Sequence, residues 1–203
     1  LTCDWSSDVC SSDLHGGWVH LFTTETLSTV DDLRKLKLFV WAGNDRMVRW
    51  WKDNGFQPVP LALTDVVTAL QTGMIEALPS TPLAALSFQW YRSTPHMLDL
   101  GFAPLLGATI MTARQWNKIS APDRTAILES AKQAAERFRK EVPEQDSRAV
   151  AEMEQRGLSL IRVSDPTALA TWTEAAGQFA ANMRETFVPP EIYDLAVQAR
   201  QEF

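Results

Sequence analysis

The chain has 203 residues, 45% of them hydrophobic, and carries 25 acidic side chains against 19 lysines and arginines, a formal net charge of −6. This length and apolar content are enough to bury the core of one or two domains. The mildly acidic balance without a basic stripe argues against a nucleic acid partner, and no run of 18 apolar residues is present that could be inserted in a membrane.

Residues 4–14, Asp-Trp-Ser-Ser-Asp-Val-Cys-Ser-Ser-Asp-Leu, resemble the translation of a common short-read sequencing adapter. They show neither a helical nor a strand period, so residues 1–14 are interpreted as an adapter-derived artefact, comparable to a tag, and are excluded from the reasoning about the fold. A genuine disordered N-terminus is the alternative. On this interpretation the authentic chain begins near His15, its signal peptide is missing, and it lacks cysteine, because Cys3 and Cys10 both lie in or beside the excluded segment.

The first half of the chain alternates strand and helix signals. Short runs rich in β-branched and aromatic residues predict strands, and Ser, Thr or Asn before an apolar periodic stretch predicts a helix start. The predicted strands are 18–23, 37–41, 58–61 and 74–78, and the predicted helices begin near residues 28, 44 and 64. This β-α-β-α-β order with short connections predicts parallel strands joined by right-handed crossovers, which is an α/β fold.

The second half is mainly helical by the same criteria. A strand is expected at 107–112, a short helix at 114–118, and a long helix that Pro122 opens and Gly157 ends. Pro143 should kink this helix without ending it, because residues with good helical propensity continue on both sides. A strand at 158–163 and two helices, which begin after Pro166 and Pro190, complete the chain.

The sequence carries none of the common motifs of catalysis or cofactor binding. The chain has no glycine-rich phosphate loop, no Gly-x-Ser-x-Gly and no His-Glu-x-x-His, and its histidines, His15, His20 and His96, lack the spacing of metal ligands. We therefore expect no enzyme activity, no cofactor and no metal site, and interpret His20 and His96 as ordinary strand or loop residues.

Three segments together resemble the DctP-type receptors of TRAP (tripartite ATP-independent periplasmic) transporters. The run 61–77, Leu-Ala-Leu-Thr-Asp-Val-Val-Thr-Ala-Leu-Gln-Thr-Gly-Met-Ile-Glu-Ala, is similar to the family's helix "S-E-V-Y-x-A-L-Q-T-G" and the strand "V-V-D-G" that follows it. Residues 30–38 are similar to "P-E-D-L-K-G-L-K-I", and 115–120 to the start of "W-x-x-L-S-P-E-x-Q". The three occur in the family's order and separations, and the resemblance extends over about residues 16–200.

This resemblance implies a two-lobed periplasmic-binding-protein fold of type II, with strands that cross between the lobes and a long kinked helix that spans both. Residues 15–105 would then form lobe two with a crossing strand, 106–145 a remnant of lobe one with the spanning helix, and 146–203 C-terminal helices that return to lobe two. Most of lobe one would be missing. The remnant should therefore expose apolar surface, and the fragment alone should be unable to close around a ligand.

The function implied by the resemblance is that of a periplasmic receptor which binds a small organic solute and delivers it to the membrane permease subunits of a TRAP transporter. Two other classes of function stay open at this point. The chain could be the effector domain of a transcriptional regulator with a helix-turn-helix upstream, or a fragment of an α/β enzyme whose motifs lie upstream. A signal peptide upstream would instead favour the receptor.

The resemblance also indicates where a solute would bind, and it departs from the family at that place. DctP-type receptors commonly hold a carboxylate with an arginine on the strand where this chain has Phe39, and a second arginine near Val19 is also absent. We therefore expect a neutral, cationic or more apolar solute that contacts Trp18, Phe39 and Trp41 through stacking or cation–π interactions. The alternative is that Arg46 or Arg49 restores a carboxylate site.

Polar contacts to the solute are expected from hydroxyl groups. Ser80 and Thr81 stand in Pro79-Ser80-Thr81-Pro82, which replaces the family's "Q-E-N-P" turn. Glu76 is a further candidate, because it occupies the place of a family acid at a strand end, although a structural carboxylate fits that position equally well.

Overall fold

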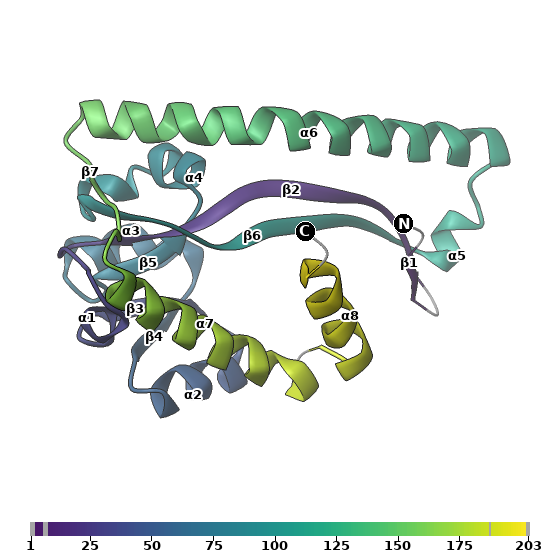
Figure 1. The fold of residues 1–203 in the computed structure, drawn as a ribbon. Helices are drawn as coiled ribbons and strands as arrows, with labels where there is room; N and C mark the ends of the chain where they lie inside the picture. The colour runs from purple at the N-terminus through teal and green to yellow at the C-terminus, as the bar shows by residue number, and fades with distance from the viewer. Residues whose placement is uncertain (1–2, 6–7, 187, 202–203) are drawn as a thin grey trace.

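The computed structural model describes residues 3–5, 8–186 and 188–201, which form one mixed β-sheet covered by helices on both faces (Figure 1). The strand order is β4-β3-β5-β2-β6-β7, with β1 paired to β2 outside this path. The strands are β1 (Cys3–Trp5), β2 (Asp8–Thr23), β3 (Lys37–Trp41), β4 (Gln57–Leu61), β5 (Ala77–Ser80), β6 (His96–Thr112) and β7 (Ser159–Ile161). The helices are α1 (Val30–Arg34), α2 (Asp45–Asp53), α3 (Val66–Gln71), α4 (Pro82–Ser87), α5 (Ala113–Trp116), α6 (Ala121–Gln155), α7 (Pro166–Thr186) and α8 (Pro190–Gln201).

The prediction of parallel strands holds for β3, β4 and β5 and is wrong for β2. Strand β3 pairs in parallel with β4 and β5, whereas β2 runs antiparallel to both β5 and β6. The α1 helix that links β2 to β3 has five residues and spans only about 7.5 Å. It cannot carry the chain back across the sheet, so β3 begins at the edge where β2 ends and runs in the opposite direction.

The two crossovers that join the parallel strands lie on opposite faces of the sheet. The β3–β4 crossover moves outward along the sheet and the β4–β5 crossover moves back past β3. On α2, Val48 and Trp51 pack against the hydrophobic cluster that contains Leu38 and Trp172, while Val66 and Leu70 of α3 belong to the cluster that contains Phe22 and Phe39. Parallel crossover connections are almost always right-handed. Two consecutive crossovers that move in opposite directions along a sheet can both be right-handed only if they lie on opposite faces.

Strand β6 is much longer than the strand expected at 107–112, and with β2 it forms a ribbon that leaves the sheet. A bulge interrupts the pairing of the two strands. Val19 pairs with Ala103 and Leu21 pairs with Leu98, so residues 99–102 of β6 lie opposite the single residue His20 of β2. Beyond this bulge the ribbon continues through Trp18↔Pro104 and carries the chain away from the sheet (Figure 1). The short helix α4 was not predicted from the sequence.

The described part of residues 4–14 is extended, although the sequence of this segment has no strand period. Cys3–Trp5 is a strand, and Asp8 to Leu14 form the first half of β2, with Asp8 paired to Thr112 of β6. Backbone hydrogen bonds to a neighbouring strand do not depend on side-chain type, which explains how a stretch without alternation can be extended. The adapter origin of this segment stays a prediction.

The long helix α6 agrees with the sequence in its two ends and in passing Pro143. The Ser120 side chain accepts a hydrogen bond from the N–H of Asp123 at its start, and Gly157, with φ +100°, follows its end. The helix runs along the β2–β6 ribbon, and α7 and α8 lie on the other side of the ribbon (Figure 1). Among the described residues, no helix is long and apolar enough to cross a bilayer.

Candidate functional site

The carboxyl ends of the parallel strands β3 and β5 meet at one edge of the sheet. Leu38 is paired with Ala77, so the last residues of the two strands, Trp41 and Ser80, lie three residues further on at the same level. Side chains alternate along a strand, and therefore Trp41 shares a face with Phe39 and Ser80 shares a face with Leu78. Phe39 and Leu78 belong to one hydrophobic cluster, which places Trp41 and Ser80 on the same face of this edge.

Trp41 is available for contact at this edge, whereas Phe39 is not. Trp41 is 59% exposed, and its ring meets that of Phe39 edge-on at a centroid distance of 5.4 Å. Phe39 is only 2% exposed in the core beneath it. The expectation that Phe39 touches a solute directly is therefore wrong for this structure, because other core side chains cover its ring. Phe39 instead supports Trp41 from below.

Trp18 lies where the β2–β6 ribbon leaves the same edge. It follows Gly17, pairs with Pro104 and is 49% exposed. A Cβ on Gly101 would approach the Trp18 ring to 3.1 Å, so the indole packs over the bulge of β6 at a residue with no side chain. Trp18 is thus held at the junction between the sheet and the ribbon.

The two hydroxyl residues are buried just behind this edge. Ser80 and Thr81 are 6% and 5% exposed. The Ser80 hydroxyl donates to the Thr81 carbonyl at 3.0 Å, so its proton is already used. Thr81 stands at the N-cap of α4 but makes no capping bond with its side chain. Of the two, Thr81 therefore retains the hydroxyl that can donate to a solute.

Glu76 lies at the other end of β5, away from Trp41 and Ser80. Its carboxylate accepts a hydrogen bond from the Lys37 N–H at 3.0 Å, and its Oε1 lies 3.8 Å from the Lys37 ammonium. The Glu76 backbone also bonds to Lys37 and Thr24. These contacts join the start of β3 to the end of β2, so Glu76 has the surroundings of a structural carboxylate, and we leave it out of the candidate site.

Two polar residues at this edge were not assigned to the site from the sequence. His20 pairs with Ser80 across β2 and β5, and its Nδ1 lies 3.3 Å from the Leu98 carbonyl oxygen. Asp146 reaches from α6 to the first turn of α4, where it accepts from the Leu83 N–H at 3.1 Å. The pKa of Asp146 is raised because burial penalises its charge, against the hydrogen bond from Leu83 and the nearby His20 and His15.

The β2 backbone fits closely around Asp146. Gly17 has φ +98°, and a Cβ at this position would collide with Oδ2 of Asp146. A glycine inside a strand indicates such a close approach, and this is the one signal in the sequence that could have located the contact. No signal in the helical sequence around Asp146 distinguishes it from the other acids of α6, because its role depends on residues more than 60 positions away.

The described residues contain no group of three or more His, Cys, Asp or Glu side chains that could hold a metal ion. The edge instead combines two exposed indoles, a buried hydroxyl and an imidazole. In open α/β sheets, ligands bind in the crevice outside the carboxyl ends of the strands. This arrangement can bind a small molecule by stacking and a few hydrogen bonds.

Comparison with known proteins gives a family match over most of the chain. The sequence model of the family described as "Bacterial extracellular solute-binding protein, family 7" (DctP) matches residues 12–186. A "Solute-binding protein" of Verminephrobacter eiseniae (strain EF01-2) is 26% identical over 130 residues, which are 64% of this chain and 38% of that protein.

Solved structures share the fold. A TRAP periplasmic solute binding protein from Shewanella oneidensis with bound succinate gives a TM-score of 0.81 at 22% identity, over 95% of this chain and 63% of that one. One from Haemophilus influenzae RdAW with bound L-gulonate gives 0.80 at 17% identity, over 96% and 62%. One from Xanthobacter autotrophicus Py2 with bound β-D-galacturonate gives 0.77 at 16%, over 94% and 61%. The chain thus spans about three fifths of the length of these proteins.

Proposed function

Because the chain belongs to the DctP family of bacterial extracellular solute-binding proteins (family 7), we propose that it is part of a periplasmic receptor which delivers a small organic solute to the membrane permease subunits of a TRAP transporter. The structural neighbours are TRAP periplasmic solute binding proteins, which supports this assignment. The proposal concerns a protein longer than 203 residues, since the chain covers about three fifths of each neighbour.

The observation that carries the proposal is the placement of Trp41, Trp18 and Thr81 around the carboxyl edge of the sheet, where the β2–β6 ribbon departs. A receptor acts by binding and not by turnover. The solute enters an open cleft, the two lobes close around it by a hinge motion, and the closed form docks on the permease. Lobe two would supply the edge described here, and the opposite wall would come from lobe one.

The enzyme and regulator alternatives are not carried forward, because the family match covers residues 12–186 and leaves little of the chain to another class. The coding sequence upstream of His15 tests this choice directly. A signal peptide followed by the remaining part of lobe one is expected. A helix-turn-helix segment or a catalytic motif in its place would contradict the receptor assignment.

We further propose that the solute is neutral, cationic or largely apolar. The three neighbours named above hold succinate, L-gulonate and β-D-galacturonate, all of which carry carboxylates. In this chain the position where the family has its carboxylate-binding arginine is Phe39, which is buried beneath Trp41. A carboxylate that lost its hydration in a closed cleft without a cationic partner would be bound weakly. Stacking on Trp41 and Trp18 favours an aromatic or cationic solute instead.

The test uses the full-length receptor, assembled with its upstream sequence and screened by thermal shift against dicarboxylates, keto acids, sugar acids, amines and neutral aromatic compounds. A stabilising amine or aromatic compound is expected, and Trp41→Ala should weaken its binding at least about tenfold, equivalent to roughly 1.4 kcal/mol. Phe88→Ala is the matched control, because Phe88 is an exposed aromatic residue at the far end of α4 and should leave binding unchanged.

Stabilisation by a C4-dicarboxylate that survives Trp41→Ala would contradict the proposed solute class while leaving the receptor function intact. Arg46→Ala and Arg49→Ala then identify the residue that binds the carboxylate. The 203-residue chain alone is a second control. It should bind none of these compounds tightly, since the opposite wall of the cleft is absent from it.

A further inference from the structure

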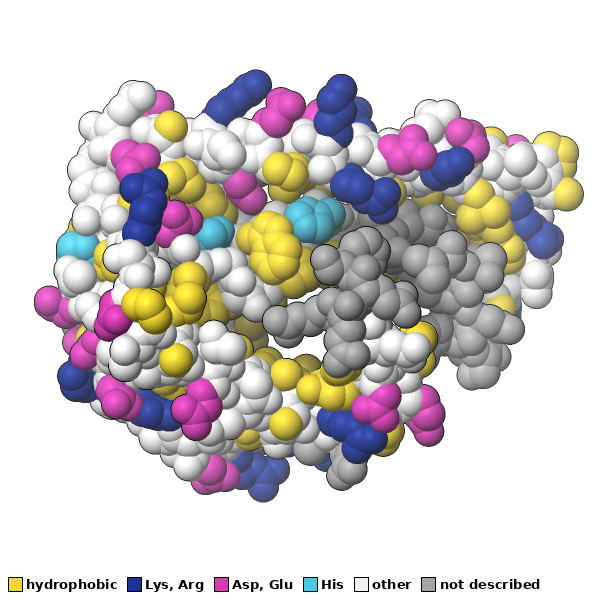
Figure 2. Space-filling view, in the orientation of Figure 1, with side chains coloured by type: hydrophobic (Ala, Val, Ile, Leu, Met, Phe, Trp, Pro, Cys, Tyr) yellow, Lys and Arg dark blue, Asp and Glu magenta, His cyan; other side chains and the backbone are white. Residues whose placement is uncertain are grey.

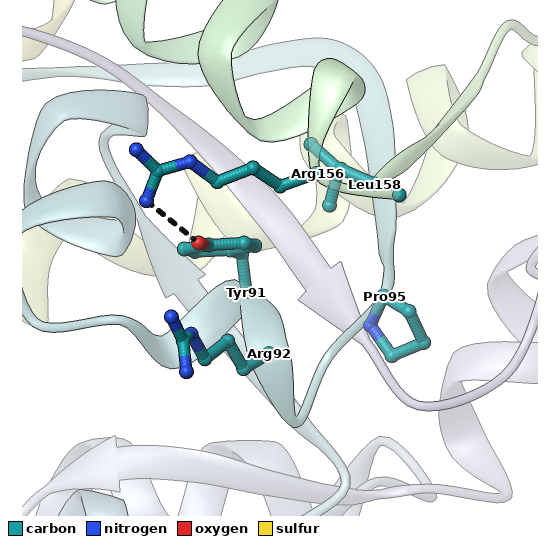
Figure 3. Close-up of a pocket in the computed structure, with 6 residues that line it drawn as sticks. Tyr91, Arg92, Pro95, Arg156 and Leu158 are labelled. Atoms are coloured by element: carbon teal, nitrogen blue, oxygen red, sulfur yellow. Dashed lines mark hydrogen bonds between the residues drawn. The ribbon is translucent and has the colours of Figure 1, made fainter.

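A second cluster of polar side chains lies at the end of the sheet opposite to Trp41 and Ser80. It surrounds the points where β6 and β7 begin, whose first residues, His96 and Ser159, are paired in parallel. A pocket of about 280 Å³ opens here. It is lined by Tyr91, Arg92, Pro95, Arg156, Gly157 and Leu158 (Figure 3).

Two guanidinium groups in this pocket flank the ring of Tyr91, and one of them bonds to its hydroxyl oxygen. Nη1 of Arg156 donates to the Tyr91 hydroxyl oxygen at 3.4 Å (Figure 3). The guanidinium of Arg92 lies on the other side of the Tyr91 ring (Figure 3). Donation by Arg156, and next by Arg92, lowers the pKa of Tyr91. Because the phenol oxygen accepts from arginine, its own O–H remains available to donate to a ligand.

The charges around the pocket do not balance. Arg156 forms an ion pair with Glu152, one turn earlier on α6. Arg92 forms no ion pair with any side chain in the described part of the chain. Arg92, Arg156 and Glu152 together therefore carry one excess positive charge, in a chain whose net charge is −6. The candidate solute site does not include these residues.

We propose that this pocket binds a small oxyanion of the phosphate or sulfate type. Arg92 and Arg156 would each donate charge-assisted hydrogen bonds to its oxygens, since the planar guanidinium group fits such oxyanions well, and the Tyr91 O–H would add a neutral one. The anion would neutralise the excess charge. This site is separate from the candidate solute site and does not depend on the receptor function.

The experiment is an isothermal titration of the 203-residue chain with inorganic phosphate, sulfate and acetate at constant ionic strength, which removes general screening as a cause. Saturable binding of phosphate or sulfate with one site is expected, and weaker binding of acetate. Arg92→Gln and Arg156→Gln should each raise the dissociation constant for phosphate at least about tenfold. Tyr91→Phe should raise it a few-fold, since only one neutral donor is lost.

Two further variants separate anion binding from a structural role of the arginines. Glu152→Gln should tighten phosphate binding, because it removes the carboxylate that competes with the anion for Arg156. If Arg156 had only a structural role, this substitution would not change the affinity for phosphate. Arg148→Gln is the control, because Arg148 is 81% exposed on the same helix and, among the residues that the structure describes, forms an ion pair only with Glu144. Absence of saturable binding, or equal affinity in the Arg92→Gln and Arg148→Gln variants, would overturn the proposal.

Discussion

The carboxylate of Asp146, in the second half of the spanning helix α6, accepts a hydrogen bond from the backbone N–H of Leu83 at 3.1 Å. Leu83 is the second residue of α4, whose own N-cap residue Thr81 makes no side-chain capping bond. Asp146 therefore caps α4 from a different element. It joins the helix that spans the ribbon to the helix that begins at the candidate site, so it positions Thr81 without touching a solute.

Replacement of Asp146 by alanine should lower the free energy of unfolding by about 1 kcal/mol, the usual cost of losing a helix cap. Asp146→Asn keeps an acceptor oxygen in the same place and should cost less. Urea unfolding followed by tryptophan fluorescence at pH 7 measures both. Equal losses for the two variants would indicate that the charge, and not the hydrogen bond, is what matters.

The stability of the wild-type chain relative to Asp146→Asn should fall as the pH rises. The folded-state pKa of Asp146 is raised by burial, so ionisation in the folded state carries a cost. This cost is absent below the unfolded-state pKa of about 3.9 and fully present above the folded-state pKa. Urea unfolding of both proteins from pH 3.5 to 7.5 tests the trend, and parallel curves would contradict it.

Gly17→Ala should be strongly destabilising because it combines a positive φ with a collision. The strained backbone alone costs about 1–3 kcal/mol. The collision of the new Cβ with the Asp146 carboxylate accounts for the rest of the destabilisation. Part of this loss should disappear in the Gly17→Ala/Asp146→Ala double variant, because that carboxylate is then absent. Gly107→Ala is the control, because a Cβ there makes only ordinary contacts at 3.8 Å or more. Additive losses in the double variant would refute the predicted contact.

Asp32 should contribute to stability at neutral pH and lose that contribution in acid. Its carboxylate accepts from the Thr29 N–H at 3.0 Å and the Lys35 ammonium at 2.9 Å. These bonds, with the Lys35 contact the largest, hold its pKa well below the usual range. The stabilisation is present above the unfolded-state pKa of about 3.9 and is lost as the pH falls toward the folded value. Asp32→Asn should cost about 1 kcal/mol at pH 7 and progressively less as the pH falls below about 3.9.

The matched control for Asp32 is Asp31→Asn. Asp31 contacts Arg34 on the surface but makes none of the α1 capping bonds. Thermal unfolding scans across pH should leave this variant close to the wild type. A loss for Asp31→Asn as large as that for Asp32→Asn would point to net charge on α1 and away from capping.

The ribbon and the first half of α6 expose an apolar surface that should bind a hydrophobic dye. Leu106 and Ile110 are 66% and 70% exposed, and Leu128 and Phe138 of α6 are exposed as well. Figure 2 shows hydrophobic side chains along the first half of α6, at the right of the view. Leu106→Ser with Ile110→Ser should reduce fluorescence of 1-anilinonaphthalene-8-sulfonate in the folded chain. Ile192→Ser in α8 serves as the control. Full-length protein should bind less dye than the 203-residue chain.

Local patterns in the sequence determined several elements correctly. The aromatic and β-branched run at 37–41 is strand β3 with the predicted bounds, and Asn44 caps α2 through a 3.1 Å bond from the Met47 N–H. The long helix begins at Ala121, one residue before the predicted opening at Pro122, and ends before Gly157 as predicted. Strand propensity, caps and glycine stops depend on residues within about one helical turn of each other, and a single sequence contains that information in full.

Only the tertiary structure decided the direction of β2, the length of β6 and the surroundings of Phe39 and Asp146. A strand signal is the same for a parallel and an antiparallel neighbour, so the pairing of His20 with Ser80 was hidden. Phe39 and Trp41 are both aromatic residues of one strand, yet Phe39 is buried and Trp41 is exposed, because the hydrophobic cluster that covers Phe39 is built from side chains as distant in the sequence as Phe22 and Leu158. Burial and hydrogen bonding of these side chains depend on partners that are distant in sequence, which local periodicity cannot specify.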